Sequence, residues 1–212
     1  LSPMTIMSIE LSSHPLVRHY LTILRDQETV AEEFRKACTG ITTVLMVEAA
    51  KQLEVDAFKV QTPLEKTEGA RIAGAVVFVP ILRAGLGMLD AAMVAVPGSS
   101  VGYIGLERDE ETAEARCYYS KMPELGAAQI VYVLDPMLAT GGSAIQSIEL
   151  IKSQGATRVS MISIIAAPEG IAALQRAHTD VSIMIGAIDR ELDENKYIRP
   201  GLGDFGDRLF KT

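Results

Sequence analysis

VLDPMLATGGSA, residues 133–144, is the stretch that decides the fold of this chain. It leads from an apolar strand through a short loop into an amphipathic helix. Gly141 and Gly142 let the backbone approach an anion with no Cβ in the way. Several amide N–H groups converge at the start of the helix, where the partial positive charge favours phosphate, and the hydroxyls of Thr140 and Ser143 add donors. The stretch therefore predicts a binding site for a sugar phosphate at the end of a strand.

Asp135 follows this strand directly. It is placed to accept hydrogen bonds from ribose hydroxyls or to hold a hydrated Mg2+. The stretch does not match the pattern G-x4-G-K-[ST], because no Lys follows the glycines, and it lacks G-x-G-x-x-G. A plain strand-to-helix turn with Ser143 as the N-cap is the alternative interpretation of the same residues.

Strands and helices alternate along the middle of the chain, where apolar runs of strand length are separated by segments with helical spacing. Such alternation predicts a parallel sheet covered on both faces, with ligands at the carboxyl ends of its strands. The predicted strands are 75–81, 101–106, 129–134, 158–165 and 181–185, with an edge strand at 116–120. The predicted helices of this region are 86–96, 143–154 and 168–177.

The two ends of the chain depart from this alternation. Two helices are predicted before it, at 16–25 and 27–53, and Gly40 is a point at which the second could divide. The segment 58–72 is interpreted as a protruding β-arm, with an ordinary surface loop as the alternative. The tail, 189–212, is rich in Gly, Asp and Arg and is expected to form a small cap rather than another strand–helix unit.

Two arginines follow other predicted strands. Arg83 lies in the loop after the Val-rich strand, with Gly85 close by, and its guanidinium fork would bind a diphosphate. Arg108 opens the loop 109–115, which holds four acids and no base and is interpreted as a lid. The alternatives are an exposed Arg83 that pairs with a surface carboxylate and a solvated loop beside Arg108.

The sequence YIRPGLGDFGDR, residues 197–208, closes the chain. Its glycines keep main-chain donors and acceptors accessible, and a planar ligand with alternating donors and acceptors can be recognised by such groups. A turn followed by a short terminal helix is the alternative.

Composition narrows the class of protein. The chain has 212 residues, of which 48% are apolar, which suits one globular core. No stretch approaches the roughly 18 apolar residues that span a bilayer, and no secretory signal is visible. Two well-separated cysteines, Cys38 and Cys117, favour a reduced cytoplasmic setting. The net charge is −7 with no Lys/Arg cluster, which argues against binding nucleic acid.

Four segments, in order along nearly the whole chain, resemble uracil phosphoribosyltransferases: KTEGARIAG, PILRAGLGM, VLDPMLATGGSA with AAPEGI, and YIRPGLGDFGD. The resemblance implies an α/β fold of the type I phosphoribosyltransferase class, with a central, mostly parallel sheet flanked by helices and a small hood over the active site. It implies one domain, 1–212, whose hood comprises 186–212, with N-terminal segments as further candidates. The implied reaction converts uracil and 5-phosphoribosyl 1-diphosphate (PRPP) into UMP and diphosphate in pyrimidine salvage, with Mg2+.

The resemblance also assigns roles residue by residue. It implies catalytic roles for Arg108, Asp135 and Asp204, with Asp204 the candidate base for uracil, and no direct protein ligand to the metal. The implied PRPP-binding residues are Arg83, Arg108, Asp135, Pro136, Met137, Leu138, Ala139, Thr140, Gly141, Gly142, Ser143 and Asp204. The implied uracil-binding residues are Ile198, Gly203, Asp204 and Phe205, acting mainly through main-chain groups.

At three positions the sequence differs from the patterns of other phosphoribosyltransferases, and these differences affect the implied roles. Most phosphoribosyltransferases of this fold have two adjacent acids at the start of the loop. Here the second position is Pro136, as in the uracil enzymes, which favours uracil over purine or orotate. Many bacterial relatives have small or aliphatic residues where this chain has Arg199 and Phe205. Main-chain contacts to the base would survive both changes, whereas the resemblance does not define the side-chain packing around the base.

Further expectations follow from the resemblance. The protein is expected to form a homodimer or larger homo-oligomer, with GTP as a candidate activator and without nucleic-acid or membrane partners. One alternative is a pyrimidine-sensing, RNA-binding regulator on the same fold, which predicts a basic face and salt-sensitive RNA affinity. Another is a nucleotide-binding module without catalysis, which predicts PRPP binding but no UMP.

Overall fold

The structure, a computed structural model, describes residues 8–108 and 115–212. Its helices are α1 (Pro15–Arg25), α2 (Ala31–Ala49), α3 (Leu86–Ala95), α4 (Gly142–Ser153), α5 (Pro168–Ala177) and α6 (Phe205–Phe210), with a 3-10 turn at Ala50–Gln52. Its longer strands are β2 (Val55–Gln61), β3 (Lys66–Ile72), β4 (Ala75–Leu82), β6 (Tyr103–Arg108), β7 (Ala115–Lys121), β8 (Gln129–Leu134), β10 (Arg158–Ala166) and β11 (Ser182–Ile188). Its short strands are β1 (Ile9–Leu11), β5 (Ser100–Val101), β9 (Met137–Leu138), β12 (Glu191–Leu192) and β13 (Ile198–Arg199).

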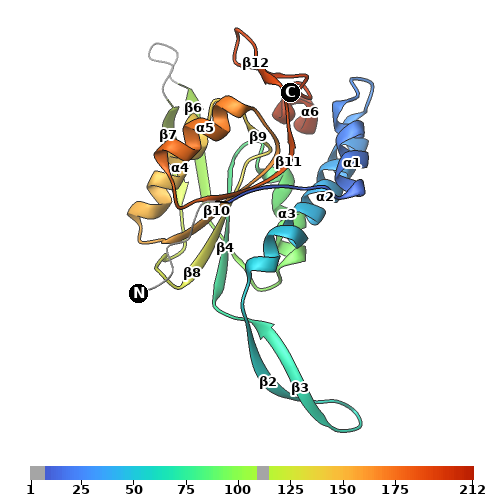
Figure 1. Ribbon diagram of the computed structural model, residues 1–212, viewed down its shortest axis with the longest axis vertical. Coiled ribbons are helices and arrows are strands. Elements are labelled where there is room, and N and C mark those ends of the chain that lie inside the picture. The colour runs from blue at the N-terminus through green and yellow to red at the C-terminus, as the bar shows by residue number, and fades with distance from the viewer. Residues whose placement is uncertain (1–7, 109–114) are drawn as a thin grey trace.

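One large sheet forms the centre of the molecule. Its strands follow the order β1-β11-β10-β8-β4-β6-β7, with β5 beside β4 and β9 beside β10. These pairs are parallel except for β6 with β7, which is antiparallel. Figure 1 shows α4 and α5 on one face of the sheet and α1, α2 and α3 on the other. The predicted mostly parallel sheet flanked by helices is therefore confirmed.

Alternating residues of each central strand serve two hydrophobic cores. In β4, Val76 and Phe78 join the core beneath α1, α2 and α3, whereas Val77 and Val79 join the core beneath α4 and α5. This follows from the two-residue repeat of a strand, since neighbouring side chains point to opposite faces. A strand buried on both faces must be apolar throughout, which explains the unbroken apolar sequence of β4.

Local differences from the prediction have physical reasons. Gly40 does not divide the second helix, because α2 is continuous from Ala31 to Ala49. A Cβ on Gly40 would lie 2.4 Å from the ring of Tyr20, so this glycine allows α1 and α2 to pack closely. The predicted strand 101–106 is shifted and broken, with Gly102 between β5 and β6. The prediction also missed β1, which is short and pairs with the edge of β11.

The predicted arm is a two-stranded hairpin, β2 with β3, that projects away from the sheet (Figure 1). It begins at Val55, slightly earlier than predicted, and its residues are mostly exposed on both faces. Within the described ranges, no helix is both long and apolar enough to cross a membrane.

Candidate active site

The loop between β8 and α4 forms a cradle at the carboxyl edge of the sheet. A cavity of about 90 Å³ is lined by Asp135 and by residues from Met137 to Ala144. Gly141, just before α4, has a left-handed conformation with φ of 86°, which glycine adopts without strain. The N-cap residue, Gly141, has no side chain that could cap α4, and the amide of Gly142 donates a long hydrogen bond, 3.5 Å, to Thr140 Oγ1. Residues of the first turn of α4 line the cavity. A cavity below the roughly 300–1,000 Å³ of drug-sized sites, next to the amides of a helix start, suits a phosphate group.

Close backbone contacts hold this cradle in place. The carbonyl of the buried Pro136 accepts hydrogen bonds from the amides of Ile164 and Ile165 in β10, both at 3.0 Å. At Gly170, near the start of α5, a Cβ would lie 2.3 Å from the carbonyl oxygen of Ala139. The AAPEGI segment therefore supports the cradle by bringing α5 against its backbone.

Asp135 lies half-buried where β8 meets the cradle. Its Oδ1 accepts a hydrogen bond from the amide of Met137 at 3.3 Å. Burial raises the pKa of Asp135 from 3.8 to about 7, against the opposing effect of that hydrogen bond. A carboxyl titrating near neutrality gains from a cation or hydroxyl donor that stabilises its charged form. Asp135 therefore suits either ribose hydroxyls or a hydrated cation.

Arg83 lies on the loop between β4 and α3, next to the end of β8. Gly85 allows this approach, because a Cβ there would lie 2.3 Å from the carbonyl oxygen of Leu134. The Arg83 side chain is exposed, and its Nη2 lies 3.5 Å from Oδ1 of Asp207 on α6. Exposed ion pairs contribute little stability, so Arg83 can exchange this carboxylate for the anion of a ligand.

Arg108 is the last residue of β6. This strand ends beside β4, where Gly105 pairs with Leu82, so the backbone of Arg108 lies at the same edge of the sheet. The rest of the predicted lid, at 109–114, lies outside the described residues, and its closure stays a prediction.

Three of the four predicted uracil-binding residues, Ile198, Gly203 and Phe205, differ in exposure. The side chains of Ile198 and Phe205 are buried in the core, and the Phe205 ring packs edge-on against Phe34 with centroids 5.0 Å apart. Gly203 is exposed and has φ of 81°. Contacts from Ile198 and Phe205 to a ligand would therefore come from main-chain groups.

The other two residues of interest in the tail have partners of their own. Asp204 is the N-cap of α6, and its Oδ1 accepts a hydrogen bond from the amide of Asp207 at 2.9 Å. Arg199 is exposed, with Nη2 2.6 Å from Oδ2 of Asp193. Arg199 is thus held on the outside of the tail.

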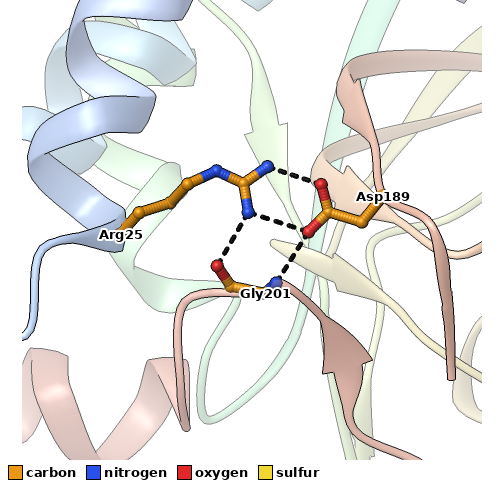
Figure 2. A network of polar contacts seen from close by, with 3 residues as sticks. All are labelled: Arg25, Asp189 and Gly201. Carbon is orange, nitrogen blue, oxygen red and sulfur yellow. Dashed lines mark hydrogen bonds and ion pairs between the residues drawn. The ribbon is translucent and has the colours of Figure 1, made fainter. Parts of the chain in front are cut away.

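A network that the sequence did not reveal holds the tail to the rest of the protein (Figure 2). Arg25, at the end of α1, donates to both carboxylate oxygens of Asp189, at 2.9 and 2.5 Å, and to the carbonyl of Gly201 at 2.7 Å. The amide of Gly201 donates to Asp189 Oδ2 at 2.9 Å. The one available signal was the position of Asp189 immediately after an apolar strand.

Arg208 makes a second connection between the tail and α1. Its Nη1 donates to the carbonyls of Leu24 and Leu202, and its Nη2 donates to the carbonyl of Asp26 at 2.5 Å. The guanidinium lies 4.5 Å from the centroid of the Phe34 ring. The carbonyls of Leu24 and Asp26 at the end of α1 thereby gain a cationic partner.

A family model for uracil phosphoribosyltransferase matches residues 11–212. The chain belongs to the uracil phosphoribosyltransferase family. A relative named uracil phosphoribosyltransferase, from Wolinella succinogenes, is 50% identical over 200 residues, which cover 94% of this chain and 96% of the relative. The structure of the AQ2163 protein from Aquifex aeolicus is 40% identical with a TM-score of 0.91, covering 95% of this chain and 97% of that one.

A more distant structure supports the fold. The adenine phosphoribosyltransferase of Thermoanaerobacter pseudethanolicus has a TM-score of 0.52 at 15% identity, over 74% of this chain and 84% of that one, a likeness that concerns the fold alone. The predicted type I phosphoribosyltransferase fold and the predicted family are both confirmed. Membership of the uracil phosphoribosyltransferase family makes the protein a glycosyltransferase. Neither the family match nor the relatives favour the RNA-binding alternative.

The residues present fit a metal ion that arrives with its substrate. In the described ranges, no three His, Cys, Asp or Glu side chains come together as a metal site. The cradle offers the carboxyl of Asp135, whose pKa burial raises to about 7, and a cation beside it would stabilise the ionised form. This donor set suits a hydrated Mg2+ held mainly by the oxygens of a uracil phosphoribosyltransferase substrate.

Proposed function

We propose that this protein transfers the phosphoribosyl group of PRPP to N1 of uracil, giving UMP and diphosphate in a Mg2+-dependent reaction. The observation that carries the proposal is the cradle at 135–144, where the first turn of a helix and the half-buried carboxyl of Asp135 line one small cavity. Peptide amides would bind the 5'-phosphate, and Asp135 would face the ribose hydroxyls.

The diphosphate would extend towards Arg83 and Arg108, at the ends of the two neighbouring strands. As the bond between C1 of the ribose and the diphosphate breaks, its electron pair leaves with the diphosphate, and these arginines stabilise the growing negative charge. Bound Mg2+ would neutralise further charge on the same leaving group. Positive charge develops on the ribose ring, where Asp135 and the phosphate oxygens face it.

Uracil would attack the same C1 through N1, which must lose its proton. Asp204 is the candidate acceptor, since it lies exposed at the start of α6 in the tail. Main-chain groups of Ile198, Gly203 and Phe205 would hold the pyrimidine. The tail and the loop 109–115 would exclude water, because hydrolysis of PRPP competes with transfer.

The proposal extends to assembly and location. We place the protein in a homodimer or larger homo-oligomer, since an isolated two-stranded hairpin is marginally stable and β2–β3 exposes Val55, Phe58 and Leu64. Light scattering would measure the oligomer. The free thiols of Cys38 and Cys117 support a cytoplasmic location. Activation by GTP is part of the same proposal, and adding GTP to the UMP assay would test it.

The deciding experiment follows UMP formation from PRPP with uracil, cytosine, orotate or guanine, each with Mg2+ or with EDTA. We expect product with uracil and Mg2+ only. PRPP binding without UMP would support a binding module instead, and salt-sensitive affinity for pyrimidine-operon leader RNA would support the regulator.

A further inference from the structure

The turn at Gly201 and Leu202 is held from two directions. Arg25 binds the carbonyl of Gly201 from α1, and Arg208 binds the carbonyl of Leu202 from α6. Asp189 accepts a hydrogen bond from the amide of Gly201. The peptide group before this glycine and the one after it therefore both have protein partners. The next residue along, Gly203, is exposed. The network therefore fixes the orientation of the peptide groups that follow the turn, including those of Gly203.

The geometry of the turn leaves little room for adjustment. Gly201 is buried with φ of 66°, and a Cβ there would lie 2.2 Å from the carbonyl oxygen of Ile198. The backbone of Gly201 is thus packed directly on Ile198. Movement at Gly201 would displace Ile198 and Gly203 together, the two residues proposed to contact the base.

The ion pair between Arg25 and Asp189 contributes more to the orientation of the turn than to the stability of the fold. Asp189 is 6% exposed, so much of the attraction between it and Arg25 is offset by the cost of removing both charges from water. What the pair supplies is a planar, bidentate fork with a third hydrogen bond in a fixed direction. A lysine at position 25 would keep the charge and lose that direction.

We propose that Arg25 and Asp189 are positioning residues for the pyrimidine: they fix the turn at Gly201 so that main-chain groups of Ile198 and Gly203 meet the base. This inference rests on the proposed function. Neither residue lines the cavity of the phosphate cradle, so their replacement should affect uracil more than PRPP.

The test measures kcat and the two KM values of UMP formation for the parent, Arg25→Lys and Asp189→Asn. For each variant we expect the KM for uracil to rise about tenfold, as for one misplaced hydrogen bond. The KM for PRPP should change less than about twofold, because the cradle is intact. Arg190→Gln is the matched control, since Arg190 pairs with Glu191 on the exposed surface beside Asp189.

Partial unfolding cannot imitate this result, because it reduces the concentration of active enzyme and leaves both KM values unchanged. A purely structural role would lower Tm and kcat without the rise in KM for uracil, and that outcome overturns the inference. Equal increases in both KM values overturn it too. If Arg25→Lys yields no folded protein, Asp189→Asn, which keeps an acceptor for Gly201, decides the question. A parent protein that forms no UMP would instead contradict the proposed function.

Discussion

Asp135→Asn removes a carboxyl whose burial has a cost in the free protein. Its pKa is raised by burial to about 7 from 3.8, so the folded protein keeps a proton that the unfolded chain has already lost. As pH rises between these values, the free energy of unfolding falls by about 1.4 kcal/mol per pH unit, and it levels off above the folded-state pKa. The full shift corresponds to about 4 kcal/mol, and partial solvent access at a half-buried group reduces the expected loss to about 2 kcal/mol.

The asparagine variant should escape this loss. Its side-chain oxygen can still accept the amide of Met137, but it does not ionise. We therefore expect the Tm of Asp135→Asn to rise relative to the parent as pH increases. Between about pH 5 and about pH 8 the difference should grow by roughly 3–5 °C for a chain of this length.

The measurement is thermal unfolding of both proteins without substrate over a series of pH values. Asp90→Asn, which alters an exposed carboxyl on α3, is the control and should show no comparable trend. A difference between Asp135→Asn and the parent that is flat with pH would mean that Asp135 is already ionised in the free folded protein. Added PRPP should raise the Tm of the parent more than that of Asp135→Asn, since a ligand stabilises the state that binds it.

Three further changes test other parts of the site. Arg108→Ala should lower kcat roughly 10²-fold, as for one donor to the transition state, and an unchanged kcat in the UMP assay would remove Arg108 from the chemistry. Gly142→Ala should fold normally, because its Cβ would lie 3.8 Å from the nearest neighbour, Thr140 Oγ1, yet a methyl in the cradle should raise the KM for PRPP. Asp207→Asn should lower the KM for PRPP a few-fold with little change in Tm, because it frees Arg83 from an exposed ion pair; an increase in that KM would contradict such competition.

The central sheet was predictable because its sequence signal is local. The strands β4, β8 and β10 are apolar runs bounded by turns, and α4 and α5 have helical spacing with clear ends. Each of these elements can therefore be predicted from a short window of sequence. That these strands form one parallel sheet with ligands at its carboxyl edge needed an additional rule about alternating strands and helices. The order of the strands was not predicted and comes from the structure.

The predictions that failed depend on contacts between distant residues. Gly40 looked like a helix break because glycine has low helix propensity. Its role becomes visible only with Tyr20 packed against it. The strand β1 has three residues and exists because β11 offers an edge to pair with.

In the candidate site, too, features encoded by neighbouring residues could be predicted, and features that depend on distant contacts could not. The cradle could be predicted because glycines, hydroxyls and an acid occur within one loop. The ties between the tail and α1 could not, since Arg25 is 164 residues away from Asp189. Nothing in the local sequence distinguishes Arg25 from an ordinary cation at the end of a helix, which is where arginine is favoured in any case.

The acidic net charge of the protein does not oppose the proposed binding of a multiply anionic ligand such as PRPP, because only nearby charges act strongly on the ligand. The net charge of −7 is distributed over the whole chain, and at physiological salt a charge beyond about 8 Å is largely screened. The cradle acts within hydrogen-bond distance, through amides at a helix start whose partial positive charge does not depend on side chains. Arg83 adds a full charge at the same edge of the sheet and already holds a carboxylate, that of Asp207. Local dipoles and placed arginines therefore outweigh the global charge at this edge, and the acidic remainder of the surface has little influence on which anion enters.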